Sequence, residues 1–239
     1  MKKEIEERLE EHAGVIGEKL EKLLLPLLDK QNDSEPEAYR RAQRFREYSV
    51  EVTARMVDAL DRKRDLAESR ILVLENGTGV MSHRLAAGDT DVVGATPNQG
   101  TADLARRINS FPSIIYRPLF QPLVVESFDL VMDSGLLAFY PRRLLEPLVQ
   151  HLASLCRRKM VLEFRVQTPF FERFFSQRST LDDSDLHLAP TVMAEPEIVN
   201  LIEAGCGMII TERRVDAGRM LIKALRKPHS RQAYFSPLK

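Results

Sequence analysis

Apolar residues recur every three or four positions over residues 4–29, and again from the polar break at residues 31–34 to about residue 67. This spacing is typical of amphipathic helices and predicts two of them in succession. Pro26 is expected to kink or end the first helix, and Ser34 with Glu37 forms a possible capping box for the second. The predicted inward faces carry Ile5, Leu9, Ile16, Leu20, Leu23, Leu24, Leu27 and Leu28, and then Ala42, Phe45, Ser49, Val52, Met56 and Leu60.

Short apolar runs alternate with segments of helical periodicity from residue 70 onward. Such alternation implies crossover helices and a mainly parallel sheet. The last two runs are joined by Asp216-Ala217-Gly218, which predicts an antiparallel edge hairpin. Strands are expected near residues 70–75, 91–95, 113–117, 128–133, 159–166, 207–214 and 218–225, and helices near 80–87, 98–109, 141–156 and 194–204. The predicted fold class is α/β, a Rossmann-like, seven-stranded, mostly parallel sheet with an N-terminal helical appendage.

These patterns divide the chain into a helical appendage at residues 1–68, an α/β domain at 69–228 and a C-terminal tail at 229–239. Within the α/β domain, residues 168–192 form a longer connection than a plain crossover needs. Four phenylalanines fall within six positions of this insertion, at Phe170, Phe171, Phe174 and Phe175. The insertion is interpreted as a helix packed on the core, a lid over an apolar substrate or a dimer contact.

The charge balance argues against a general nucleic-acid binder, because 35 basic residues are matched by 35 acidic ones. No apolar run has the length of a membrane span, and the first residues are too acidic for a secretory signal. The two cysteines, Cys156 and Cys206, are far apart and lack metal-ligand spacing. We therefore expect a reduced, cytoplasmic protein with no nucleic-acid or membrane partner.

A polar cluster in the insertion combines carboxylates with an imidazole, at Asp182, Asp183, Asp185 and His187. Its spacing matches no strong metal signature, so a solvated loop is favoured and no metal is predicted. His187 is kept as a candidate general base.

Residues 70–82 carry the most informative local pattern of the chain. An apolar run of strand length ends in Glu75, and a turn with Gly77 and Gly79 follows before a segment that can begin a helix. Glycines at such a turn let the backbone approach a ligand, and the first turn of the helix presents free N–H groups to it. The stretch therefore predicts a nucleotide site at the edge of the sheet.

Several segments match a known family in order. They are Glu75-Asn76-Gly77-Thr78-Gly79-Val80-Met81 after the first strand, Pro122, Ser127-Phe128-Asp129-Leu130-Val131 in the fourth, and Leu201-Ile202-Glu203-Ala204-Gly205-Cys206 before the sixth. Over residues 70–227 the chain resembles the class I S-adenosylmethionine-dependent methyltransferases. The resemblance implies a seven-stranded sheet whose last strand is inserted antiparallel, and S-adenosylmethionine as cofactor.

The resemblance also implies roles for residues at the carboxyl ends of the first strands. Glu75 would fix the turn and the amino end of the cofactor, and Gly77 and Gly79 would give close backbone approach. Asn76 and Thr78 occupy the remaining places of this turn and are assigned to the cofactor site with them.

Three positions depart from the family pattern. Met81 stands at the third glycine, Thr96 stands where a carboxylate usually holds the ribose, and Arg117 stands where an acidic residue often holds the adenine. Thr96 can make one hydrogen bond to the ribose, and Arg117 can stack on the adenine or pair with the cofactor's carboxylate. These changes leave open a weakened or lost cofactor site.

Candidates for chemistry follow the fourth strand. Asp133 either faces cofactor and acceptor or caps the next turn, and Tyr140 either lines the acceptor pocket or packs beneath a helix. The first hypothesis is methyl transfer to a small-molecule acceptor, with Asp133, Tyr140 and His187 as candidate catalytic residues. The alternative is a non-catalytic interaction or scaffold module, with possible homodimers through the N-terminal helices or the Phe-rich insertion. Another nucleotide-using α/β enzyme is a weaker third option.

Overall fold

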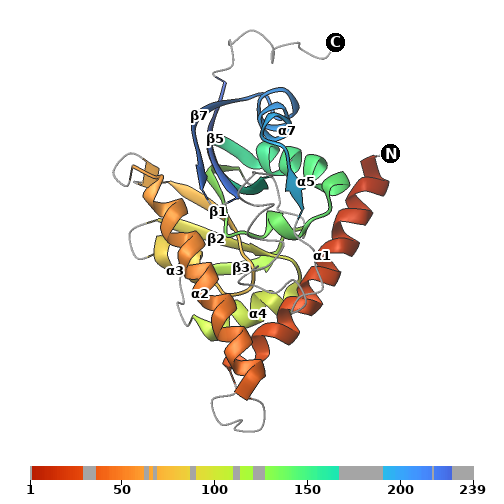
Figure 1. Cartoon of the computed structure of the whole chain (residues 1–239), viewed down its shortest axis with the longest axis vertical. Coiled ribbons are helices and arrows are strands. Elements are labelled where there is room, and N and C mark those ends of the chain that lie inside the picture. Colours follow the sequence, from red (N-terminus) through yellow and green to blue (C-terminus); the bar gives the residue numbers. More distant parts are fainter. Residues whose placement is uncertain are drawn as a thin grey trace, which may run out of the picture.

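A computed structural model of the chain describes residues 2–28, 36–61, 65–66, 69–86, 90–109, 114–120, 127–166, 191–216 and 218–227. Figure 1 shows a twisted sheet in the middle of the molecule, with two long N-terminal helices diverging from a common end along its two sides. The tail at 229–239, Pro122, His187 and the Phe-rich part of the 168–192 insertion lie outside the described residues.

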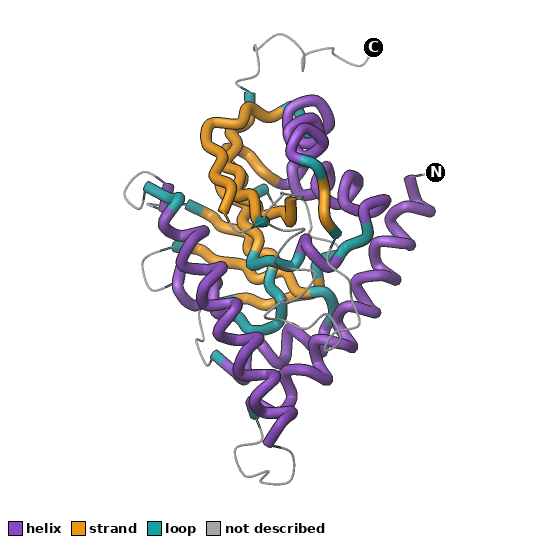
Figure 2. The backbone as a smooth tube through the Cα atoms, viewed as in Figure 1, coloured by secondary structure: helices purple, strands orange, loops and turns teal. Residues whose placement is uncertain are grey.

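The sheet has the strand order β3-β2-β1-β4-β5-β8-β7. Its strands are β1 (Arg70–Leu74), β2 (Asp91–Thr96), β3 (Ile115–Pro118), β4 (Phe128–Asp133), β5 (Cys156–Val166), β6 (Val192–Met193), β7 (Met208–Asp216) and β8 (Arg219–Arg226). Strands β1 to β5 pair in parallel, whereas β8 is antiparallel to both β5 and β7. The predicted α/β class, parallel sheet and antiparallel hairpin are therefore confirmed, and Figure 2 shows the strands as one layer between helices.

One strand of the sheet was not predicted. The two-residue strand β6 pairs in parallel with the end of β5, at Arg165 and Val166, and makes the sheet eight-stranded. Two residues are too few to show a period of two, which explains why the sequence pattern missed β6.

The helices of the α/β part begin and end near the predicted positions. They are α3 (Val80–Leu85), α4 (Gln99–Ile108), α5 (Arg142–Leu155) and α7 (Glu195–Asn200), the last continued by a π-turn at Leu201–Gly205. Asn98 explains where α4 begins, since its side chain accepts a hydrogen bond from the Thr101 N–H while Thr101 bonds back to the Asn98 backbone.

The N-terminal helices are α1 (Lys2–Leu24), which ends in a short 3₁₀ turn containing Pro26, and α2 (Pro36–Asp58). The predicted apolar face of α1 is buried, with Ile16, Leu20 and Leu24 all at 0% exposure. These side chains belong to the same hydrophobic core as the strands. The two helices are therefore packed on the sheet and cover part of it.

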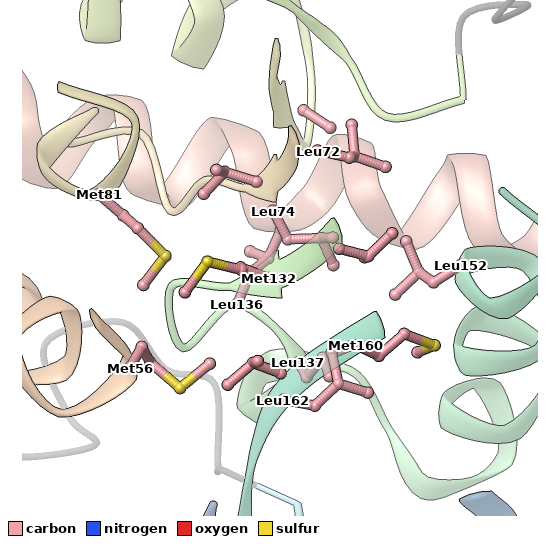
Figure 3. Close-up of a cluster of buried hydrophobic side chains, with 14 of the residues drawn as sticks. Met56, Leu72, Leu74, Met81, Met132, Leu136, Leu137, Leu152, Met160 and Leu162 are labelled. Carbon is pink, nitrogen blue, oxygen red and sulfur yellow. The ribbon is translucent and has the colours of Figure 1, made fainter. Parts of the chain in front are cut away.

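The core lies around the central strands. Ile71–Leu74 and Leu130–Met132 are fully buried, as expected for parallel strands covered on both faces. Figure 3 shows Met56 of α2, Met81 of α3 and Met132 of β4 gathered in one cluster of buried side chains. Met81, which occupies the third glycine place of the first motif, therefore fills the hydrophobic core.

Candidate cofactor crevice

The carboxyl ends of four strands meet at one edge of the sheet. Leu74 of β1 is in register with both Ala95 of β2 and Asp133 of β4, and Ala95 is in register with Arg117 of β3. Ligands of open parallel sheets bind at such an edge. The edge therefore brings together most of the residues that the sequence predicted.

The turn from β1 to α3 has the backbone that its glycines suggest. Gly77 and Gly79 have φ values of +87° and +66°, in the left-handed region that other residues rarely adopt. Asn76 holds the turn in place, because its Nδ2 donates to Ser49 Oγ at 2.9 Å and to the Ser134 carbonyl at 3.0 Å. The first motif is thereby tied to α2 and to the end of β4.

Glu75 is fully buried beneath this turn. Its Oε1 accepts hydrogen bonds from Ser82 N and Ser82 Oγ, both at 2.7 Å, in the first turn of α3. Its Oε2 has no hydrogen-bond partner in the part of the chain that the structure describes. Burial raises the pKa of Glu75 to about 7, against the hydrogen bonds from Ser82 and the nearby backbone of Gly79, which lower it. The second oxygen is therefore suited to accept a hydrogen bond from a ligand.

The hydroxyl at the end of β2 already donates a hydrogen bond within the protein. Thr96 is buried, and its Oγ1 donates to the Asn98 carbonyl at 2.9 Å. The Asn98 side chain then donates to Glu21 Oε1 of α1 at 2.7 Å. Arg117 is half-buried on β3, one strand further out. The carboxylate bonded to Asn98, two residues after Thr96, thus belongs to α1.

At the end of β4, Asp133 caps the following turn. Its Oδ1 accepts from Leu136 N at 2.8 Å and from Leu137 N at 3.2 Å. Oδ2 is buried and has no partner among the described residues. Burial, opposed by the backbone hydrogen bonds and aided by nearby Glu163, raises the pKa of Asp133 to about 8. At neutral pH the Asp133 carboxyl therefore holds a proton.

Tyr140 lies close to the same strand end. It is fully buried, and its ring stands 5.4 Å from the ring of His12 on α1. The Tyr140 hydroxyl has no partner among the described residues, and burial raises its pKa above the ordinary value. Tyr140 is therefore packed beneath α1 with an unmet hydrogen-bonding group.

Helix α1 covers this edge of the sheet. A Cβ at Gly77 would lie 3.0 Å from Leu24, and Gly17 of α1 is in direct contact with the Asn98 side chain. Further along α1, His12 Nε2 is 3.2 Å from the Phe139 carbonyl. From the other side of the turn, a Cβ at Gly79 would lie 2.7 Å from the Tyr116 hydroxyl. The space beside both glycines is thus occupied by the protein's own side chains.

The residues present meet the needs of S-adenosylmethionine in part. The unpartnered Glu75 Oε2 can accept a hydrogen bond from a ligand, and the unpartnered Asp133 Oδ2, which holds the proton of the neutral carboxyl, can donate one. A Cβ at Gly77 would, however, lie 3.0 Å from Leu24, and Asn98 is bonded to Glu21, so side chains of α1 occupy space beside the turn.

The structure brings together most of the predicted site residues. Of these, Glu75, Asn76, Gly77, Thr78, Gly79, Thr96, Asp133 and Tyr140 are all buried at this edge. Sequence reasoning missed the contributions of α1, above all Glu21 and Leu24, and those of Ser49. Only Ser49 carried a signal, because it is a polar residue on the predicted inward face of the second helix.

Two classes of site find no support in the described residues. No group of three or more His, Cys, Asp or Glu side chains within them is arranged to hold a metal ion. Among the helices described, none combines the length and the apolar character that crossing a membrane requires.

The strand order and the glycine turn at the carboxyl edge define the class I S-adenosylmethionine-dependent methyltransferase fold. No protein-family model matches the sequence, and no curated protein matches it closely enough to be counted as a relative. Solved structures do match. Magnesium protoporphyrin IX methyltransferase from Synechocystis PCC 6803, with bound S-adenosylhomocysteine, has a TM-score of 0.59 at 15% identity over 84% of this chain and 91% of its own.

Two further structures support the same fold. An O-methyltransferase family protein from Burkholderia thailandensis has a TM-score of 0.59 at 16% identity, over 90% of this chain and 70% of its own. The N-methyltransferase NodS from Bradyrhizobium japonicum has a TM-score of 0.52 at 15% identity, over 76% of this chain and 98% of its own. The Synechocystis enzyme was also solved with S-adenosylmethionine, so this molecule is the cofactor of the fold.

Proposed function

We propose that this protein transfers a methyl group from S-adenosylmethionine to a small-molecule acceptor. The observation that carries the proposal is the buried Glu75 Oε2, which has no donor among the described residues and lies beneath a glycine turn at the carboxyl edge of a methyltransferase fold. An acceptor buried without a donor costs about 1–3 kcal/mol. A ligand that donates to this oxygen would remove that cost.

Each residue of the crevice has a role that follows from its position. The cofactor, when bound, supplies an activated methyl group. Gly77 and Gly79 give backbone approach at the turn, and Glu75 holds the amino end of the cofactor. Thr96 and Arg117 remain the proposed contacts to its ribose and adenine.

The acceptor side has its own proposed groups. Asp133 holds a proton at neutral pH through its raised pKa and presents the free Oδ2 at the end of β4. Tyr140 adds a buried hydroxyl next to it. Methyl transfer depends chiefly on the alignment of donor and acceptor, so the main work of these groups is to position the acceptor. His187 stays a candidate base from the sequence.

Entry of the cofactor requires the end of α1 to leave the turn. Exposing one leucine side chain costs about 1.5–3 kcal/mol, and Leu24 is the side chain in contact with Gly77. The 3₁₀ turn at Leu25–Leu27 follows directly and ends the helix. The free energy of a local opening around Leu24 is therefore smaller than the binding free energy of a micromolar ligand.

A calorimetric titration of the full chain tests the proposal. We expect heat of binding with S-adenosylmethionine and with S-adenosylhomocysteine, and none with adenosine monophosphate, which lacks the amino acid end that Glu75 would hold. Absence of binding for both sulfur compounds at millimolar ligand would contradict the proposal.

A second candidate is a non-catalytic interaction module with the same fold. The contacts of Leu24 with Gly77 and of Tyr116 with Gly79 favour it, since they fill the place of a ligand with the protein's own side chains. This candidate predicts that shortening Leu24 leaves the protein unable to bind either sulfur compound. A homodimer through the N-terminal helices remains a proposal under both candidates.

A further inference from the structure

A second cluster of buried polar groups lies beside the crevice, between α2 and the strands β5 and β8. Arg165, near the end of β5, stands opposite Arg219, at the start of β8, in the antiparallel ladder. Both guanidinium groups lie over the ring of Tyr48, with Cζ at 5.8 Å and 4.9 Å from its centre. Two like charges on neighbouring strands are therefore held beside one aromatic ring, which costs energy unless an anion separates them.

The positive charge of this cluster is only partly balanced. Glu163 is the buried carboxylate at its centre, with 4% of its side chain exposed, and it pairs at 2.9 Å with Arg55 of α2. Arg219 Nη1 stays 3.9 Å from Glu163 and 3.8 Å from the exposed Glu51. Among the described residues, these two carboxylates are set against the guanidinium groups of Arg55, Arg165 and Arg219, which leaves one positive charge in excess there.

Two donor atoms of the cluster are also unsatisfied. Arg165 Nε and Arg219 Nη1 are buried, and neither has a hydrogen-bond acceptor among the described residues. Burial lowers the pKa of Arg219, as expected for a charge that has lost its water. Buried charges and donors are ordinarily paired in folded proteins. Within the part of the chain that the structure describes, the cluster therefore lacks one anionic acceptor.

The position of the cluster links it to the acceptor side of the crevice. Arg165 Nη2 donates to the Tyr48 hydroxyl at 3.4 Å, and a Cβ at Gly135 would lie 3.1 Å from that hydroxyl. Gly135 follows Asp133 by two residues, at the carboxyl end of β4. An anion held by the two arginines would therefore lie next to the groups proposed to position the acceptor.

We propose that the methyl acceptor carries an anionic group, a carboxylate or a phosphate, which Arg165 and Arg219 bind beside Tyr48. This inference rests on the proposed function, because only methyl transfer makes the bound anion a methyl acceptor. Planar guanidinium groups suit both anions, because their parallel N–H groups match two oxygens at once.

The test uses small probes and the full chain without cofactor. Calorimetry with benzoate, its neutral isostere benzamide and inorganic phosphate separates charge recognition from apolar binding. We expect benzoate or phosphate to bind at least about tenfold more tightly than benzamide, the factor that one charge-assisted hydrogen bond provides. Preference for phosphate over benzoate would assign the phosphate class. Equal binding of benzoate and benzamide with no phosphate binding, or binding of none of the three, would overturn the proposal.

Matched variants identify the arginines. Arg165→Gln and Arg219→Gln should each weaken the preferred anion about tenfold. Arg213→Gln, which removes an exposed charge on β7, should leave the affinity unchanged. Loss of equal size in the Arg213 variant would contradict the assignment. Urea unfolding confirms that each variant is folded, and either arginine alone suffices for the test.

Titration with S-adenosylhomocysteine on the same samples separates the two proposals. Anion binding without cofactor binding would refute methyl transfer and leave an anion site in place. Cofactor binding without anion binding would refute only the anionic acceptor.

Discussion

The two halves of the crevice treat their buried polar groups differently. Over β1 and β2, Asn76, Thr96 and Asn98 are bonded to the protein's own chain, in part through α1 and α2, whereas Glu75 Oε2 has no partner among the described residues. Over β4, β5 and β8, buried atoms of Asp133, Tyr140, Arg165 and Arg219 lack partners among the described residues. The polar groups named over β1 and β2 are thus mostly satisfied within the protein, with Glu75 Oε2 as the exception. Those named over β4, β5 and β8 keep unmet hydrogen-bonding capacity among the described residues.

The largest expected effect concerns the satisfied half. Asn76→Ala should lower the free energy of unfolding by about 2–4 kcal/mol, because it removes the donor to Ser49 Oγ and to the Ser134 carbonyl and opens a small cavity. Urea unfolding measures the change. Asn200→Ala, at an exposed helical position, is the control and should stay within about 0.5 kcal/mol. Similar decreases in the free energy of unfolding in both variants would contradict a special role of the turn in stability.

An intermediate effect concerns the pH dependence of stability. The pKa values of Glu75 and Asp133 in the folded protein are about 7 and about 8, above the values near 4 of an unfolded chain. The folded state therefore binds more protons between about pH 4 and pH 8, and stability falls as pH rises through this window. We expect urea unfolding to give a lower free energy of unfolding at pH 8.5 than at pH 5.

Asp133→Asn provides the matched control for this pH dependence. Asparagine keeps an oxygen for the N–H groups of Leu136 and Leu137 but cannot ionise. The stability of this variant should fall less steeply with pH than that of the wild type. An unchanged slope would show that the buried carboxyl does not carry the effect.

The smallest effect concerns the unsatisfied half. Tyr140→Phe removes a buried hydroxyl without a partner and should change stability by no more than about 1 kcal/mol, in the stabilising direction. Thermal unfolding measures this shift. A loss above 1 kcal/mol would mean that the Tyr140 hydroxyl is satisfied, and would weaken the contrast between the two halves.

The sequence predicted the sheet better than it predicted the site. The apolar run Ile71–Leu74 predicts a buried strand, and the turn residues Asp216–Gly218 predict a hairpin. Both the strand and the hairpin are confirmed. Val192–Met193 shows too short a pattern to be recognised as a strand. The cap formed by Asp133 was one of two interpretations, because a carboxylate after a strand suits a cap and a ligand site alike.

What the sequence could not show are contacts between distant segments. Glu21 meets Asn98 across 77 positions, and no local periodicity specifies which polar residue of α1 reaches the crevice. Leu24 looked like any other residue of an apolar helix face, yet its contact with Gly77 decides whether the turn is open. Buried atoms without a hydrogen-bond partner among the described residues, such as Arg219 Nη1, can likewise be identified only from the folded structure.

The affinity for S-adenosylhomocysteine of a Leu24→Ala variant, measured by calorimetry beside the wild type, tests the central claim most directly. If Leu24 closes a working cofactor site, removing its side chain relieves the cost of displacing it, and binding should tighten at least about tenfold. Leu25→Ala, at a neighbouring position that is 50% exposed, should leave the affinity unchanged. Leu24→Val gives a milder change if the alanine variant is unstable. Binding in none of these proteins would contradict the account.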